Sequence, residues 1–149
     1  MRYIFLTVDG VLNTAYEWKE KKYTVNWEKV GFLAAICKAY GASVVVTSNW
    51  SRGYYAERPE KSTAPFRELL RAFKKYDIPF AGVTPVLNNR RKEEEIKRFL
   101  MKNSGEYIIL DNTIAGYTDK SRLFVIDHHH GLSKEKTVEI IKKLNPNYR

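Results

Sequence analysis

Apolar residues along the chain alternate between two spacings. Short, unbroken apolar runs that end in polar or turn-forming residues predict β-strands buried on both faces. Longer segments with apolar residues three or four positions apart predict helices that bury one side. The predicted strands are residues 2–8, 43–48, 80–84, 107–110 and 122–126, of which 80–84 is the weakest. The predicted helices are residues 27–40, 63–76, 92–103 and 133–144.

Local signals mark the ends of two of these helices. Gly41 is expected to stop the first one, because glycine adopts the left-handed conformation of a helix C-cap without strain. Ser133 is expected to cap the last one, although Lys136 rather than Glu stands at the capping-box position. The expected apolar stripes are Val30, Leu33, Ala34, Cys37 and Tyr40 in helix 27–40, and Phe66, Leu69, Leu70 and Phe73 in helix 63–76.

Strands that alternate with helices of this length favour an α/β fold, with a parallel sheet of about five strands flanked by helices. We find no repeat, low-complexity tract or linker in the sequence, so residues 1–149 are expected to form one domain. In such sheets a ligand binds beyond the carboxyl ends of the strands.

Polar residues follow four of the predicted strands, at the ends where a ligand would bind. Each group alone is consistent with residues that cap a turn. Together they indicate a functional site, because separate loops have no other reason to collect hydroxyl and carboxyl groups at one edge of a sheet. The groups are Thr7 and Asp9, then Thr47, Ser48 and Asn49, then Asp111 and Asn112, and finally Asp127 and His128.

Charge and cysteine content add to this interpretation. The formal net charge is +9, with 26 Lys and Arg against 17 Asp and Glu. This excess predicts an anionic ligand, nucleotide or nucleic acid among them, while a basic solvated surface is the alternative. The single cysteine, Cys37, excludes a disulfide within the chain and favours a cytoplasmic setting. We expect no signal peptide and no membrane association, because no apolar run approaches roughly 18 residues.

Several of these segments resemble the motifs of the haloacid dehalogenase-like (HAD) phosphatases. FLTVDGVLNT is similar to their first motif, VVVTSNWS to the second, RKEEEIKRFL to the third and YIILDNT to the fourth. The tryptophan of SNW, the GVTP stretch and RLFVIDHHHGLS further resemble the small, nearly capless HAD domains of RNA-repair proteins of the Swiss Army knife type. The resemblance covers nearly the whole chain, and it implies a Rossmann-like (HAD-like) domain with a minimal cap.

The resemblance also implies a role for the acidic residues. Asp9 would be the general acid and base, and its backbone carbonyl would face a magnesium ion. Asp111 would be a carboxylate ligand of that ion, as hard oxygen donors suit Mg²⁺. Asn112 stands where many members have a second acid, so only a weak magnesium site is expected.

By the same resemblance, another set of residues would hold the phosphate. Ser48 would donate a hydrogen bond to it, with Thr47 as the alternative register and Asn49 as a neighbour. Lys92 would neutralise its charge, or Arg91 if the helix begins earlier. The expected ligand is a phosphorylated small molecule or a nucleotide, with nucleic acid as a further candidate because of the positive charge.

The chain departs from the family at the nucleophile, because Thr7 stands where the family has aspartate. A threonine hydroxyl attacks phosphorus only if a neighbouring base removes its proton. Three interpretations remain open. The domain is an atypical phosphohydrolase that uses Asp9 to activate water or Thr7, or it is an inactive module that binds phosphate or nucleic acid, or Thr7 is a substitution that traps the substrate of an active phosphatase.

Two further groups are candidates for auxiliary roles. His128, His129 and His130 lie together beside Asp127, where a histidine could supply a metal or phosphate contact; a solvated polar loop is the alternative. The short loops expected around the cleft mix aromatic and basic residues, which either stack on bases and contact phosphates or pack onto the domain. These residues are Tyr16, Trp18, Trp50, Tyr54, Tyr55, Arg52 and Arg58.

Overall fold

One sheet of five parallel strands, in the order β3-β2-β1-β4-β5, runs through the centre of the molecule. The fold comes from a computed structural model that describes residues 1–20, 24–87 and 91–146. The strands are β1 Arg2–Leu6, β2 Ser43–Val46, β3 Phe80–Val83, β4 Glu106–Asp111 and β5 Leu123–Val125. The α/β fold with a parallel sheet flanked by helices is therefore confirmed.

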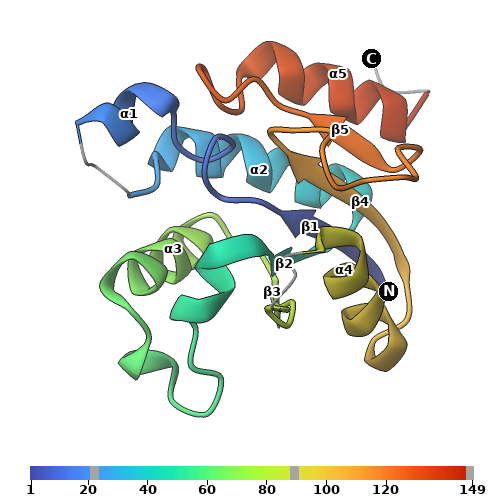
Figure 1. Cartoon of the computed structure of the whole chain (residues 1–149). Coiled ribbons are helices and arrows are strands. Elements are labelled where there is room, and N and C mark those ends of the chain that lie inside the picture. The colour runs from blue at the N-terminus through green and yellow to red at the C-terminus, as the bar shows by residue number, and fades with distance from the viewer. Residues whose placement is uncertain (21–23, 88–90, 147–149) are drawn as a thin grey trace.

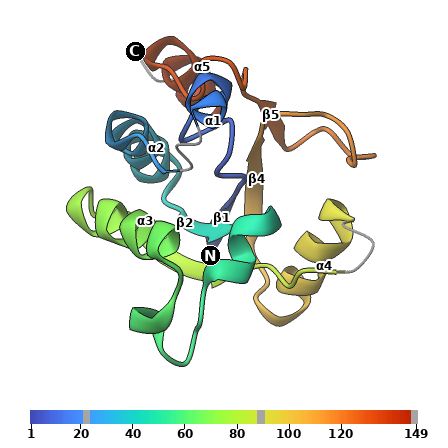
Figure 2. The same cartoon turned by 60° about the vertical axis from the view of Figure 1, so that its left-hand side comes forward.

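The helices cover the two faces of the sheet unequally (Figures 1 and 2). One face carries α2, α3 and α5, with α2 packed between the other two, while α4 packs on the opposite face. The helices are α1 Ala15–Lys19, α2 Trp27–Tyr40, α3 Ala64–Lys75, α4 Lys92–Lys102 and α5 Lys134–Leu144. Two 3₁₀ turns, Ser48–Gly53 and Pro59–Lys61, lie between β2 and α3. Within the described residues, no helix is both long and apolar enough to cross a membrane.

Two clusters of buried side chains hold the layers together. The larger fills the space between the sheet and the three-helix face, and its fully buried members include Leu33 of α2 and Leu69 of α3. The smaller joins α4 to the sheet through Phe99, whose ring meets those of Tyr3 and Phe5 edge-on at 5.3 and 5.6 Å. Burial of each such large side chain contributes about 1.5–3 kcal/mol, so the larger cluster contributes most of the stability.

The predicted helix ends are confirmed. Gly41 ends α2 in the left-handed conformation with φ 69°, and its N–H donates to the Cys37 carbonyl. Ser133 caps α5, where its Oγ accepts a hydrogen bond from the Lys136 N–H at 3.1 Å. The predicted stripe on α2 was incomplete, because Ile36 is fully buried while Ala34 and Tyr40 are only half-buried.

Several boundaries differ from the sequence prediction, and the predicted strand 2–8 already ends at Leu6. Strand 43–48 ends at Val46, because the chain turns into the 3₁₀ segment from Ser48. Strand 122–126 is shorter, with only Leu123–Val125 paired to β4. The predicted loop after the first strand contains α1, which Thr14 caps: the Glu17 N–H donates to Thr14 Oγ1, and the Thr14 hydroxyl donates to the Glu17 carboxylate.

The topology fixes where a ligand site forms. The connections from β1 to β3 pass over the three-helix face, whereas the connection into β4 passes through α4 on the other face. The strand order therefore reverses between β1 and β4. The carboxyl ends of strands separate at such a reversal and leave a crevice there.

Candidate functional site

A pocket of about 250 Å³ opens beyond the carboxyl ends of β1 and β2 and the start of α4. It brings together Thr7 and Asp9 after β1, Asn49 after β2 and Lys92 at the first turn of α4, all of which the sequence marked as site residues. The remaining lining residues are Val8, Trp50, Val86 and Glu95. Hydroxyl, carboxyl and ammonium groups thus share one small cavity.

The Asp9 carboxylate is held in place by two N–H donors. Asn13 Nδ2 donates to Asp9 Oδ1 at 2.9 Å, and Trp50 Nε1 donates to the same oxygen at 3.0 Å. Asn13 is itself fully buried, and its own Oδ1 accepts hydrogen bonds from Gly10 N and Trp18 Nε1, each at 2.9 Å. A carboxylate fixed by these two neutral donors keeps its orientation, as a general acid or base requires.

Asp111 lies at the end of β4, and its carboxylate is completely buried. Its Oδ2 accepts from Lys92 Nζ and from the Tyr117 hydroxyl, both at 2.7 Å, and its Oδ1 accepts from the Asn112 backbone N–H at 2.6 Å. Burial, and after it the Asp111 charge, raises the pKa of Tyr117 well above its usual range, so the phenol stays protonated and donates. Lys92 therefore pairs with the Asp111 carboxylate and also lines the pocket.

Asn112 joins the two oxygens that were expected to hold magnesium. Its backbone N–H donates to Asp111 Oδ1 and its side-chain Nδ2 donates to the Asp9 carbonyl, each at 2.6 Å. The donors fit Mg²⁺ in kind, since a carboxylate and a carbonyl are hard oxygen ligands. Both oxygens already accept hydrogen bonds from Asn112, so an ion at this position would compete with these N–H groups.

Thr7 is buried, with 6% of its surface exposed, and its hydroxyl lies 3.3 Å from that of Thr47. The Thr47 hydroxyl in turn donates to the Leu6 carbonyl at 3.1 Å. In the hydrogen bonds found among the described residues, no carboxylate or imidazole reaches the Thr7 hydroxyl, and Asp9 bonds to Asn13 and Trp50 instead. Among the residues that the structure describes, Thr7 therefore has no base to activate it.

The other candidate phosphate contacts differ in their burial and in whether they line the pocket. Thr47 is buried behind Thr7, whereas Asn49 is exposed and lines the pocket. The side chain of Ser48 lies outside the described residues. Lys92 is a pocket-lining cation, and Arg91 is the exposed residue that precedes α4.

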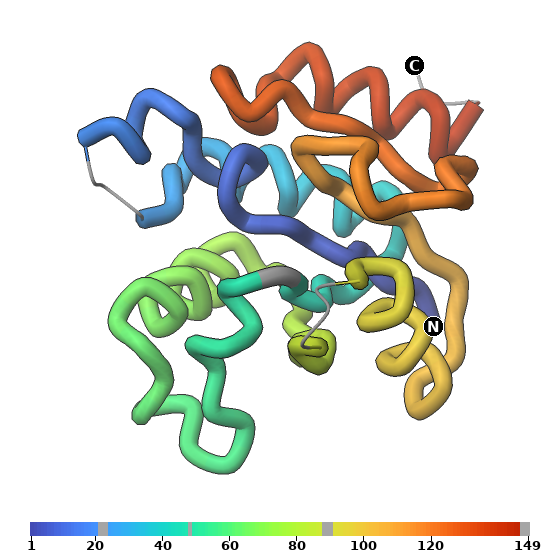
Figure 3. Tube along the Cα trace, viewed as in Figure 1, coloured from blue at the N-terminus to red at the C-terminus, as the bar shows by residue number. Residues whose placement is uncertain are grey.

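Asp127 and His128 lie outside the lining of this pocket, on the turn that follows β5. This turn packs beside the loop after β1, where Ala15 N donates to the His128 carbonyl at 2.9 Å and Leu132 N to the Val11 carbonyl at 2.8 Å (Figure 3). The His128 ring is parallel to that of Trp18, with centroids 6.2 Å apart. The turn thus reaches Asp9 only indirectly, through Trp18 and Asn13.

The aromatic residues of the cleft loops fall into two groups. Trp50 and Tyr54 pack onto the domain, and the Tyr54 ring lies 5.1 Å from those of both Phe66 and Phe80. Tyr16 and Tyr55 are 58% and 52% exposed. Arg52 and Arg58 are exposed, so aromatic and basic groups on these loops remain accessible to a ligand.

Residues 3–137 match the family model described as the HAD domain in Swiss Army Knife RNA repair proteins. The chain belongs to this family. Its membership agrees with the order of the sheet and with the gathering of the strand-end residues at the point where that order reverses. A comparison with curated proteins found no match.

Three residues of the HAD site were not predicted from the sequence: Asn13, Tyr117 and Glu95. Asn13 donates to Asp9, and Tyr117 donates to Asp111. Trp18 was expected as an aromatic residue of the cleft loops, but its hydrogen bond to Asn13 was not. Glu95 is a buried residue of α4 that lines the pocket, where its Oε2 accepts from the Leu87 N–H at 2.8 Å. Only Glu95 carried a signal, since it falls on the same side of the predicted helix as Lys92 and Phe99.

Proposed function

We propose that this HAD domain is a phosphohydrolase with an atypical site, which removes phosphate from the end of an RNA chain or from a nucleotide. The observation that carries the proposal is the Asp9 carboxylate, which Asn13 and Trp50 hold in a pocket that Lys92 also lines. A fixed carboxylate and a nearby cation are the two groups that proton transfer and phosphate binding require.

In this proposal water, rather than Thr7, attacks phosphorus. The Thr7 hydroxyl has a hydroxyl neighbour and no base, whereas Asp9 faces the pocket. Asp9 removes a proton from the water as its oxygen forms a bond to phosphorus and the ester P–O bond breaks. Asp9 then returns the proton to the departing oxygen. Lys92 and the Asn49 amide stabilise the charge on the other phosphate oxygens.

Asp111 and the Asp9 carbonyl are the residues that would hold magnesium, which supplies further neutralisation of the phosphate when it is bound. Their hydrogen bonds to Asn112 make the binding weak. Lys92 already provides part of the same positive charge. The chain therefore depends less on the ion than a site with three carboxylates would.

Three features support an RNA end or a nucleotide as the substrate. The family is described by its occurrence in RNA repair proteins, the net charge is +9, and the loops around the pocket expose Tyr16, Tyr55, Arg52 and Arg58. Single-stranded nucleic acid is bound by aromatic rings that stack on bases and by basic groups that contact phosphates. A terminal phosphate can enter the pocket while the neighbouring nucleotides lie on these loops.

The test measures phosphate release from short RNAs that carry a 5′- or a 3′-phosphate, with and without Mg²⁺. Asp9→Asn should abolish release and leave the fold unchanged, because the amide keeps the shape of the carboxylate. Asp119→Asn is the matched control, since Asp119 is an exposed carboxylate that does not line the pocket. Release that continues unchanged in Asp9→Asn would rule out the proposed role of Asp9.

A phosphate-binding module without turnover is the second candidate. It is favoured by the lack of a base beside Thr7 and by the engagement of Asp111 with Lys92, Tyr117 and Asn112. In that case, an RNA with a terminal phosphate should bind more tightly than the same RNA with a terminal hydroxyl, yet no phosphate should be released. Lys92 is unsuitable for this test, because its removal leaves the Asp111 charge buried and unpaired, at a cost of about 3–5 kcal/mol.

A further inference from the structure

The turn after β5 gathers three side chains that can bind a metal ion away from the phosphate pocket. One ligand atom each from Asp127, His128 and His129 lies within 4.8 Å of the others. We propose that these three residues form a site for a divalent transition-metal ion of the zinc class. This is the one group of three such side chains found among the described residues.

The ligand types decide which ion the site prefers. Two imidazoles and one carboxylate suit Zn²⁺, Co²⁺ and Ni²⁺, whereas Mg²⁺ and Ca²⁺ prefer sites built from oxygen ligands alone. In tetrahedral coordination with bonds of about 2.0–2.1 Å, ligand atoms stand about 3.4 Å apart. The three ligand atoms now lie within 4.8 Å of one another, so binding an ion would bring them closer, which their exposed or half-exposed side chains allow.

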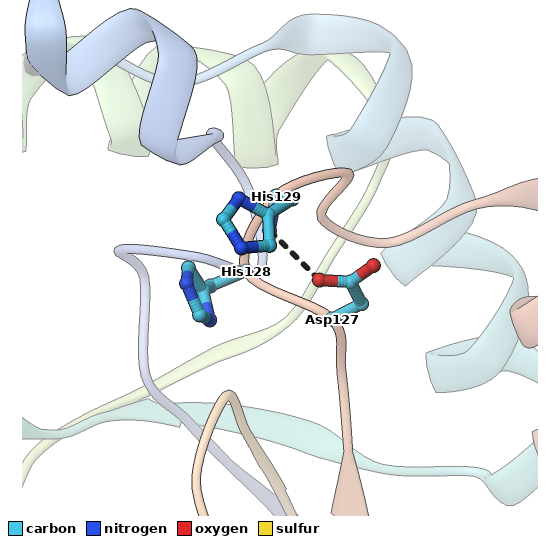
Figure 4. Close-up of side chains that lie close together, drawn as sticks. All are labelled: Asp127, His128 and His129. Carbon is cyan, nitrogen blue, oxygen red and sulfur yellow. Dashed lines mark hydrogen bonds between the residues drawn. The ribbon is translucent and has the colours of Figure 1, made fainter.

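The backbone and neighbouring side chains already hold the turn in shape. The Asp127 carboxylate accepts from the His129 N–H at 2.9 Å and from His130 Nδ1 at 2.7 Å, and these two bonds lower its pKa. Figure 4 shows the rings of His128 and His129 side by side, with the Asp127 carboxylate on the same turn. Their centroids are 4.2 Å apart. His130 bonds to a proposed ligand and so orients it without belonging to the cluster.

Three protein ligands leave one position of a tetrahedral ion open to water or to an anion. The site differs in this respect from a closed structural zinc site, which has four protein ligands. It also stands apart from the weak magnesium site, which would use Asp111 and the Asp9 carbonyl. The two sites can therefore be titrated separately, with different ions.

The test is a titration of the whole protein with Zn²⁺ by calorimetry, in the presence of excess Mg²⁺. One ion should bind per chain. His129→Gln and Asp127→Asn should each lower the affinity at least about tenfold, because each removes one ligand. Asp119→Asn is the matched control for Asp127→Asn: it makes the same substitution at an exposed carboxylate outside the cluster, so the affinity should stay unchanged.

A second measurement locates the ion. Co²⁺ bound to His128 should quench the fluorescence of Trp18, whose ring faces that of His128 at 6.2 Å. Trp18→Phe should remove most of this quenching while Zn²⁺ still binds. An equal loss of affinity in Asp119→Asn and Asp127→Asn would show that general negative charge, rather than this cluster, holds the ion, and it would overturn the proposal. Zn²⁺ binding that survives Asp127→Asn and disappears in Asp111→Asn would place the ion in the pocket and overturn it as well.

Discussion

By the resemblance to the HAD phosphatases, Thr7 and Asn112 are two neutral residues where many members have acids. Thr7 turns its hydroxyl toward Thr47, and Asn112 donates N–H groups to the oxygens of Asp9 and Asp111. Each uses a neutral side chain where a carboxylate would attract a cation. Two substitutions therefore separate the interpretations of the site.

Thr7→Asp should raise magnesium-dependent phosphate release by at least about tenfold, equivalent to about 1.4 kcal/mol of transition-state stabilisation. The new carboxylate stands where the family resemblance puts the nucleophile, and Asp9 remains able to protonate the leaving group. Steady-state phosphate release is the measurement, with Thr7→Val as the control of similar shape. An active Thr7→Asp variant with an inert wild type would agree with a substrate-trapping substitution, whereas a folded but inert variant would favour the binding module.

Asn112→Asp should tighten magnesium binding by at least about tenfold, because it adds a carboxylate and removes the amide donor from the Asp9 carbonyl. Calorimetric titration with Mg²⁺ measures the change. Thr113→Asp is the control, because it adds the same negative charge one position further along the turn. If both variants bind the ion equally well, general negative charge rather than the geometry of Asn112 controls the affinity.

The sequence could predict the residues that end the strands, because a parallel sheet brings those ends to one edge. It could not predict the hydrogen bonds of Asn13, Trp18 or Tyr117, since their partners depend on how the loops fold back over the sheet. Nor could it show that Lys92 pairs with Asp111, which lies 19 residues away on a neighbouring element. Side-chain chemistry was predictable, whereas hydrogen-bond partners were not.

At the scale of elements, the turn between β1 and α1 is the most constrained part of the site. Gly10 has a φ of 84°, and a Cβ at this position would meet Asn112 Nδ2 at 2.6 Å. The helices and strands themselves were predictable from periodicity, apart from α1. Its N-cap residue, Thr14, was present in the sequence, but five residues without a buried side chain give no apolar stripe.

Gly10→Ala should destabilise the domain by about 2 kcal/mol or more, from the cost of a left-handed alanine and from the clash with Asn112. Urea denaturation measures the free energy of unfolding. Gly116→Ala is the matched control, since Gly116 has a φ of 89° but no atom within 4 Å of the added Cβ. Gly116→Ala should lower the free energy of unfolding by about 1 kcal/mol, because only the left-handed backbone of alanine is unfavourable there. Equal losses in the two variants would mean that Asn112 moves aside freely.

For the molecule as a whole, the charge of +9 predicts an effect of salt on RNA binding. Each phosphate contact to single-stranded nucleic acid adds about 0.7 to the slope of log affinity against log salt. Arg58→Ala and Arg52→Ala should each reduce this slope by about 0.7 in binding measurements across a range of salt concentrations. Lys142→Ala, an exposed charge on α5, is the control and should leave the slope unchanged. A flat salt dependence in the wild type would count against nucleic acid and favour a small phosphorylated metabolite.

The unequal coverage of the sheet has a consequence for motion. Because α4 lacks the flanking helices that support α2, its amide hydrogens should exchange with deuterium through a local opening that costs less free energy than global unfolding. Mass spectrometry of exchange in the native state should therefore show earlier labelling of α4 than of α2; equal labelling would contradict this. Lys92 travels with α4, so each opening carries the ammonium group away from Asp111. The Lys92 charge would then lie in the pocket only while α4 is closed, and phosphate could leave when α4 opens.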